Sequence, residues 1–217
     1  MFKNYISTNS RKIQKLATII FVFSVFLSAN LNAQIVFLLS KDSYSAEKKI
    51  TKAINSCPGG VAFGIYSINY EQLFGNNHGL VCRFDYEDVP KNYTEAKLKA
   101  KGGALILNYR YHLSGEMESG YIGIYSRYRV YSGTGTLEST NFDFTIPEVT
   151  LGVNIGKRWV WDNGINLNLA FGYGFFLLKD QKTSPLIEST NSILDKFEDS
   201  YDFIDPFLGE FSIGYAF

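Results

Sequence analysis

The chain has 217 residues, a length typical of one domain. Its 21 basic and 21 acidic residues balance, but residues 1–33 hold four bases and no acid, so the remainder carries 17 − 21 = −4. A negative remainder would not attract nucleic acid, and we expect no nucleic-acid partner.

The first 33 residues have the parts of a signal peptide. A basic head precedes the apolar run 16–27, and small residues lead to Ala33. The alternative is a membrane anchor that is retained, but a span needs ~20 apolar residues and this run has 12. We therefore expect cleavage between Ala33 and Gln34, which leaves 34–217 as an exported domain. No cysteine lies at the cleavage position, which argues against a lipid anchor.

Seven segments of the mature chain alternate apolar side chains with polar or small ones. Successive side chains of a strand point to opposite faces, so this period of two residues predicts β-strands. In the segment 165–178, Ile165 and Leu167 would share one face while Asn166 and Asn168 share the other. The seven predicted strands are 61–72, 79–87, 104–112, 121–131, 148–161, 165–178 and 207–217.

The connections between these strands alternate in length. Short ones at 74–78, 114–119 and 162–164 alternate with longer ones at 88–101, 132–141 and 179–206. Bacterial membrane barrels have short periplasmic turns, long outer loops and an even number of strands. An eighth strand is therefore expected at 35–39 or at 49–57. We prefer 49–57, because Cys57-Pro58-Gly59-Gly60 would supply the next connection.

These features predict an all-β fold, an eight-stranded antiparallel transmembrane β-barrel with up-and-down meander topology. A soluble sandwich or a soluble ligand-binding barrel would show the same alternation. Small residues on the polar faces favour a narrow membrane barrel, as do aromatic residues near the strand ends. These aromatics are Tyr86, Tyr109, Tyr111, Trp159, Trp161, Tyr215 and Phe217.

The polar faces carry five bases and five acids that would point into the barrel. The interior of an eight-stranded barrel is just filled by side chains. We therefore predict a lumen filled by ion pairs, closed to the traffic of a general porin. The network comprises Arg83, Arg110, Arg127, Arg129, Arg158, Glu71, Asp85, Glu87, Glu148 and Glu210.

No residue pattern predicts an enzyme. Barrel enzymes that modify lipid A need a histidine near the outer rim, but His78 falls in a predicted periplasmic turn and His112 lies beside the next one. We expect no catalytic, cofactor-binding or metal-binding residue. Lys48, Lys49, Lys97, Lys99 and Lys101 are predicted to be solvated surface charges, which at an outer rim could pair with lipopolysaccharide phosphates.

A disulfide between Cys57 and Cys82 is not expected. A hairpin centred on 75–77 would place Cys82 opposite Asn69 and leave Cys57 twelve residues further along the strand, or ~40 Å away. A disulfide needs Cα atoms within ~7 Å. The two cysteines could meet only if the N-terminal segment folds back.

Glu210, Tyr215 and Phe217 resemble the C-terminal signal that the barrel-assembly machinery reads in outer-membrane proteins, with Ser212 where glycine is usual. The region 49–217 resembles a family of small barrels classed as a domain of unknown function, and its type is similar to the membrane domain of outer membrane protein A. The resemblance lies in Ile68-Asn69-Tyr70-Glu71, in Leu107-Asn108-Tyr109-Arg110-Tyr111 and in 150–161 followed by Asp162-Asn163-Gly164. It implies barrel architecture and no catalytic residue.

The predicted function is that of a small closed barrel in the bacterial outer membrane, with a structural role or a role in surface interaction through its loops. Its expected partners are outer-membrane lipid, lipopolysaccharide and, during biogenesis, the assembly machinery, and we expect a monomer. The alternative is an outer-membrane enzyme or a carrier of small ligands or lipids acting at the outer rim, where 179–206 would form a cap. The role of 179–206 stays open.

Overall fold

The computed structural model describes residues 49–89, 98–137, 140–185 and 207–217, and strands make up most of them. In chain order the elements are β1 (Lys52–Ser56), α2 (Pro58–Val61), β2 (Ile65–Phe74), β3 (His78–Val89), β4 (Lys99–His112), β5 (Ser119–Leu137), β6 (Thr140–Val160), β7 (Ile165–Lys179), β8 (Lys182–Ser184) and β9 (Phe207–Ala216). No helical segment in these ranges is long and apolar enough to cross a membrane.

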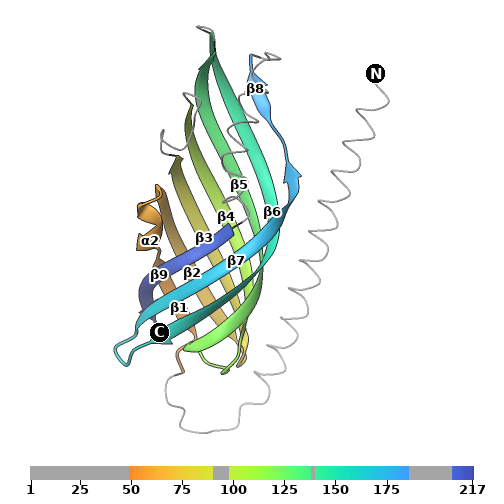
Figure 1. The fold of residues 1–217 in the computed structure, drawn as a ribbon. Coiled ribbons are helices and arrows are strands. Elements are labelled where there is room, and N and C mark those ends of the chain that lie inside the picture. Colours follow the sequence, from red (N-terminus) through yellow and green to blue (C-terminus); the bar gives the residue numbers. More distant parts are fainter. Residues whose placement is uncertain (1–48, 90–97, 138–139, 186–206) are drawn as a thin grey trace. The chain divides into compact units, whose positions relative to one another are not determined.

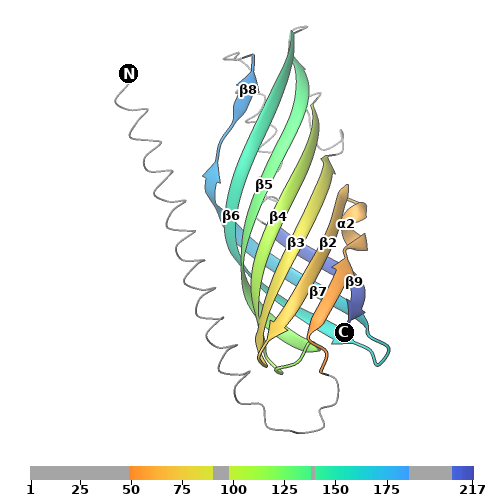
Figure 2. The ribbon, with the colours of Figure 1, turned by 180° about the vertical axis from the view of Figure 1, so that it is seen from behind.

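Eight of the strands close into an antiparallel ring (Figures 1 and 2). Neighbours in sequence pair from β1 through β7, then β7 pairs with β9 and β9 pairs with β1. The short β8 pairs only with β6, at Asp143–Thr145. The predicted count of eight strands and the choice of 49–57 for the first are both confirmed. The rejected candidate 35–39 lies outside the described residues.

The ring has two different ends, which we call the turn end and the loop end. The turn end holds the three short connections at Gly75–Asn77, 113–118 and 161–164, together with the carboxyl terminus (Figure 1). The loop end holds α2 and the positions where the chain leaves β3, β5 and β8. The predicted short connections are therefore confirmed, and they share one end.

Several predicted boundaries were wrong. The expected loop 88–101 is strand through Val89 and again from Lys99, and the expected connection 179–206 contains the short strand β8. The segment 132–141, read as a loop because of its Gly, Ser and Thr content, is strand through Leu137 and again from Thr140, so β5 and β6 project past their neighbours at the loop end (Figure 2). The strand expected from residue 61 begins at Ile65. Pro58 has the fixed φ that suits the first turn of a helix, and Gly64 reverses the chain at φ 75°.

Each strand of the ring has one buried face and one exposed face. In β4, the even-numbered side chains from Ala100 to His112 are all buried, and the odd-numbered ones are exposed or half-buried. The buried faces point into the ring. The largest side chains buried there include Arg110, Arg158 and Glu71, so the interior is polar through much of its length.

Candidate functional site: the interior of the ring

All ten charged side chains predicted to face inwards are buried. They come from six of the eight ring strands. Closure of the ring therefore brings together side chains that are distant in the sequence. Five arginines and five carboxylates lie there, so their formal charges cancel.

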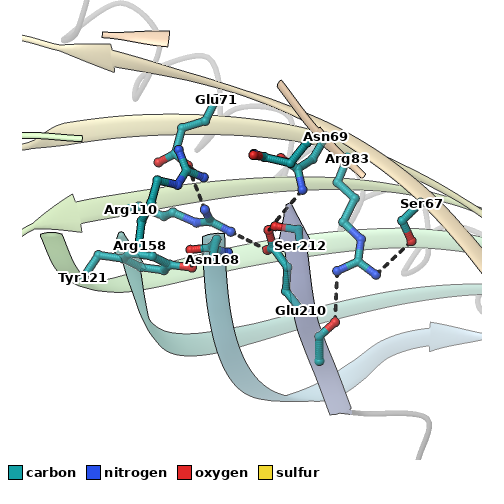
Figure 3. A network of polar contacts seen from close by, with 12 residues as sticks. Ser67, Asn69, Glu71, Arg83, Arg110, Tyr121, Arg158, Asn168, Glu210 and Ser212 are labelled. Carbon is teal, nitrogen blue, oxygen red and sulfur yellow. Dashed lines mark hydrogen bonds and ion pairs between the residues drawn. The ribbon is translucent and has the colours of Figure 1, made fainter. Parts of the chain in front are cut away.

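Glu71 is the centre of the largest group (Figure 3). Its Oε2 lies 2.7 Å from Arg110 Nη1 and 2.7 Å from Arg158 Nη2, and its Oε1 lies 2.8 Å from His112 Nε2. Arg158 comes from β6, across the ring from Glu71 on β2. None of these four side chains is accessible to solvent. One carboxylate therefore balances two buried guanidinium groups from different strands.

Glu210 continues this group towards β9. Its Oε2 accepts a 2.6 Å bond from Arg110 Nη2, and its Oε1 accepts bonds from Asn69 Nδ2 at 3.0 Å and Ser212 Oγ at 2.8 Å. The guanidinium of Arg110 also lies 4.4 Å from the ring centre of Tyr121. Arg110 thus links carboxylates on β2 and β9, and we call the Glu71 and Glu210 groups together the central network.

A second group lies nearer the loop end. Arg129 Nη2 lies 2.9 Å from Glu148 Oε2 on the paired residue of β6, and Arg129 Nη1 lies 3.6 Å from Glu87. Tyr131 donates a 2.7 Å hydrogen bond to Glu87, and Lys179 Nζ lies 3.9 Å from Glu148. We call this group the loop-end network.

The remaining two arginines bind different kinds of acceptor. Arg83 Nε lies 2.6 Å from Asp85, and one of its Nη atoms donates to the Gly209 carbonyl. The other Nη atom donates to the Ser67 hydroxyl (Figure 3). Arg127 donates to the Phe207 carbonyl at 3.3 Å and to the Thr150 hydroxyl at 3.5 Å. Carboxylates are therefore not the only acceptors for the buried arginines.

Apolar side chains fill the interior at both ends. At the turn end, a cluster of Ala53, Leu73, Met117 and Ala216 packs with Ile50 and Val160. At the loop end, the buried inward side chains are Leu98, which directly precedes β4, Ala100 on β4, and Phe142, Phe144 and Ile146 on β6. Along β6 the inward side chains are apolar from Phe142 to Ile146, charged at Glu148, polar or small from Thr150 to Gly156, charged at Arg158 and apolar at Val160.

Five inward aromatic rings each pack over a glycine that is the paired residue on the neighbouring strand. A Cβ built on Gly152 would lie 2.6 Å from Cε1 of Tyr125, closer than real Cβ contacts come. Each glycine thus leaves the space that its partner ring fills. The pairs are Tyr121–Gly156, Tyr125–Gly152, Tyr131–Gly102, Phe142–Gly135 and Phe144–Gly133.

The outer face of the ring carries a belt of exposed apolar side chains, which we call the apolar belt. Exposed fractions reach 64% at Ile155 and 60% at Phe171. The belt includes Ile68, Phe84, Ile122, Ile124, Tyr128, Val153, Ile155, Phe171, Tyr173, Phe211 and Ile213.

The distribution reverses where β5 and β6 project beyond the belt. Past the pair Arg129–Glu148, the first outward pair is Val130 and Pro147, both half-buried, and the outward side chains beyond it are Ser132, Thr134, Thr136, Asn141, Asp143 and Thr145. The inward side chains there are mainly aromatic or aliphatic. In the belt it is the outward side chains that are apolar.

The two histidines occupy different environments. His112 is fully buried in the central network. His78 opens β3 on the outer face at the turn end, where its Nδ1 lies 2.6 Å from the Tyr109 hydroxyl. Neither lies at the loop end. In the described part of the chain, no cluster of His, Cys, Asp or Glu is arranged to hold a metal ion.

Both cysteines are free. The expected register was wrong by one residue, because Cys82 pairs with Tyr70 and Asn69 pairs with Arg83. The chain also folds back through α2, so Cys57 lies near Ser67. Burial raises the pKa of the Cys57 thiol to about 11, and Arg83 offsets part of that rise. At neutral pH this thiol is protonated and therefore a poor nucleophile.

The three residues of the expected assembly signal face different ways. Glu210 is buried in the central network, whereas Tyr215 and Phe217 are exposed on the outer face with ring centres 6.4 Å apart. The backbone of Phe217 binds β1, through its carbonyl to Thr51 and Lys52 and through its N–H to Lys52.

Several network residues were not predicted from the sequence. Asn69, Tyr121 and Tyr131 stand at inward positions of the apolar–polar alternation, so this alternation was sufficient to predict that they face the interior. Lys179 follows the register shift between β6 and β7 at Val149–Thr150, and no alternation could have placed it. Met117, whose Sδ lies 2.8 Å from Arg158 Nη1, comes from a connection that has no alternation.

The family model described as "Protein of unknown function (DUF3575)" matches residues 32–207. No curated protein matches the chain, and no solved structure does. The match covers most of the sequence and nearly all of the ring, and the chain therefore belongs to this uncharacterised family.

Proposed function

We propose that this protein spans the outer membrane of a bacterium as a small, closed, eight-stranded β-barrel, with a structural role or a role in surface interaction. The observation that carries the proposal is the apolar belt around a ring whose interior is charged. A soluble protein rarely exposes a contiguous apolar patch larger than a few hundred Å². Membrane barrels have this distribution, with an apolar lipid face and a polar interior.

The reversal along β5 and β6 supports a membrane boundary near the pair Arg129–Glu148. Outward hydroxyl and carboxylate side chains such as Thr134 and Asp143 need water, whereas outward Ile122 and Ile124 gain from a hydrocarbon environment. Lys99 and Lys101 are exposed on the outward face of β4 at this level, where they could meet lipopolysaccharide phosphates. In this orientation the loop end faces the exterior and the turn end faces the periplasm.

The interior supports a closed barrel over a general porin. Side chains of the two networks cross the ring, and the turn-end cluster of Leu73, Met117 and their neighbours closes the periplasmic side with apolar groups. The enzyme or carrier alternative gains no support from the histidines or from Cys57. The proposal includes removal of residues 1–33 during export and folding by the barrel-assembly machinery.

Cysteine labelling in intact cells tests the proposal. In a Cys57→Ser, Cys82→Ser background, Ile124→Cys and Thr134→Cys form a matched pair, since both positions are outward and exposed on β5. We expect a membrane-impermeant maleimide to label Thr134→Cys and to leave Ile124→Cys unlabelled until the protein is unfolded. Asn163→Cys, in a short turn, should be labelled only after the outer membrane is permeabilised. Recovery of the protein in the soluble fraction, or equal labelling at 124 and 134, would reject the proposal.

A further inference from the structure

We propose that a groove on the outer face of the ring binds one phospholipid, with an acyl chain lying along β5 and β6 and the phosphate at Lys157. The inference rests on the proposed function, because it needs the outer face to meet lipid. It adds one site for a particular lipid to an apolar belt whose other residues would contact any lipid of the bilayer.

The groove is formed by a difference in side-chain size between neighbouring strands. Its floor consists of Ile122 and Ile124 on β5 with Val153 and Ile155 on β6, all short and β-branched. Tyr109 and Tyr111 form one wall on β4. Phe171, Tyr173 and Phe207 form the other on β7 and β9, where the rings of Tyr173 and Phe207 meet edge to face at 5.3 Å.

The register explains why these residues form a channel. Tyr109 pairs with Ile124, Ile124 with Val153, and Val153 with Tyr173, so short side chains sit between tall ones in a single row. Tyr111, Ile122, Ile155 and Phe171 repeat the arrangement one step closer to the turn end. Because both rows have the same profile, the groove extends over two successive rows of outward side chains, enough to hold part of an acyl chain between the two walls.

The volume and lining suit such a chain. The groove is open to the outside, has a volume of about 600 Å³ and is lined almost entirely by apolar surface. That volume lies within the range of ~300–1,000 Å³ found for small-molecule sites, which are mostly apolar with few polar groups.

A cation lies just beyond the turn-end side of the groove, next to the residues that line it. Lys157 is the next outward residue after Ile155 on β6, ~7 Å further towards the turn end. Its side chain is exposed, and its Nζ lies 5.4 Å from the ring centre of Trp159. Gly120, the residue paired with it on β5, has no side chain of its own, and Leu113 Cδ1 lies 3.6 Å from where a Cβ of Gly120 would be. An ammonium beside an aromatic ring at the rim of an apolar channel complements a lipid phosphate.

The position of Lys157 selects the class of lipid. It lies towards the turn end, which faces the periplasm in the proposed orientation, so the headgroup belongs to a glycerophospholipid of the inner leaflet. A second copy of this chain fits less well, because the tall walls on both sides would hold its broad outer face away from the floor.

Native mass spectrometry of the full-length mature protein in mild detergent tests the site. Phosphatidylglycerol and diacylglycerol are supplied separately after delipidation. Val153→Trp fills the floor, and Ile68→Trp adds the same ring to an outward position on β2, away from the groove. We expect one retained phosphatidylglycerol in the wild type and in Ile68→Trp, and about tenfold less in Val153→Trp. Lys157→Gln should lose phosphatidylglycerol severalfold and keep the weaker diacylglycerol binding of the wild type.

Insertion into vesicles, assayed by heat-modifiable migration, is measured first for every variant. A wild type that fails to insert overturns the proposed function and with it this inference. Inserted proteins that retain the same amount of lipid in Val153→Trp and Ile68→Trp overturn the inference alone. A wild-type dimer that Val153→Trp converts to a monomer assigns the groove to a second copy and also overturns it. If Val153→Trp does not fold, unchanged phosphatidylglycerol binding in Lys157→Gln overturns the headgroup site.

Discussion

Removal of the Glu71 side chain would leave two buried arginines without their shared carboxylate. Its carboxylate lies 2.7 Å from both Arg110 and Arg158, in a position without solvent access. Removing a single partner from a buried ion pair leaves an uncompensated charge, which is far more costly than losing an exposed pair.

We therefore expect Glu71→Ala to lower the free energy of unfolding by at least ~3–5 kcal/mol, the usual cost of breaking one buried pair. Lys182→Ala, at an exposed position, should change it by less than ~0.5 kcal/mol. Urea unfolding of vesicle-inserted protein, followed by tryptophan fluorescence, measures both. Similar losses for the two variants would show that the central network contributes little to stability.

The aromatic–glycine pairs make a second prediction at the same scale. In Gly152→Val the new side chain would collide with the Tyr125 ring, whereas a Cβ on the outward-facing Gly209 has nothing within 4 Å. We expect Gly152→Val to reduce the yield of folded protein strongly, because overpacking typically costs ~1–3 kcal/mol or more. Gly209→Val should fold like the wild type. Heat-modifiable migration on gels compares them, and equal yields would contradict the role given to the glycine.

Ring closure depends on one short pair of elements. β1 contributes Lys52–Ser56 and meets β9 through four paired positions, and the backbone of Phe217 adds bonds to Thr51 and Lys52. In the membrane setting that we propose, an open sheet edge would leave its backbone groups unpaired in hydrocarbon, which costs several kcal/mol for each group. The last residue therefore contributes to closure through its backbone as well as through its exposed ring.

Deletion of Phe217 should accordingly impair assembly more than deletion of one residue from the connection 186–206, since connections tolerate such changes. The measurement is the amount of heat-modifiable protein in isolated outer membranes. Comparable amounts for both deletions would contradict the prediction. Phe217→Ala separates the two contributions, because it keeps the backbone bonds and removes only the aromatic side chain.

On the scale of the whole ring, the interior consists of successive layers of apolar and charged side chains. Apolar side chains close the turn end, two charged networks occupy the middle, and apolar side chains return at the loop end. Ion conduction needs a continuous water-filled path, and we expect these layers to interrupt it.

Planar-bilayer recordings of the wild type should therefore show no large, stable, porin-like steps. Combining Leu73→Ser with Met117→Ser should raise the ion leak, because it introduces polar groups into the turn-end cluster. Leu113→Ser is the control, since Leu113 lies at the same end but is 64% exposed. Porin-like steps in the wild type would refute the closed interior.

The sequence alone was enough to predict the eight strands of the ring and the direction in which their charged residues point, although not β8 or all of the strand boundaries. These features follow from the period of two and from the spacing of connections, which are local properties of the chain. The phase of Arg110 or Glu71 is readable from its immediate neighbours. The projecting ends of β5 and β6 were missed because the glycines and threonines there are typical of a loop. Their role in a strand depends on the rings of Phe142 and Phe144, which pack over Gly135 and Gly133 in the folded chain.

Only the tertiary structure decided which partners meet. Glu71 binds arginines from β4 and β6, and Arg110 reaches Glu210 on β9, because closure of the ring and the stagger of its strands bring these side chains to one level. The outer groove has the same origin, since it depends on which long and short side chains the register places in one row. Alternation along a strand determines its two faces, but contacts across strands depend on register and curvature, which the local pattern does not encode.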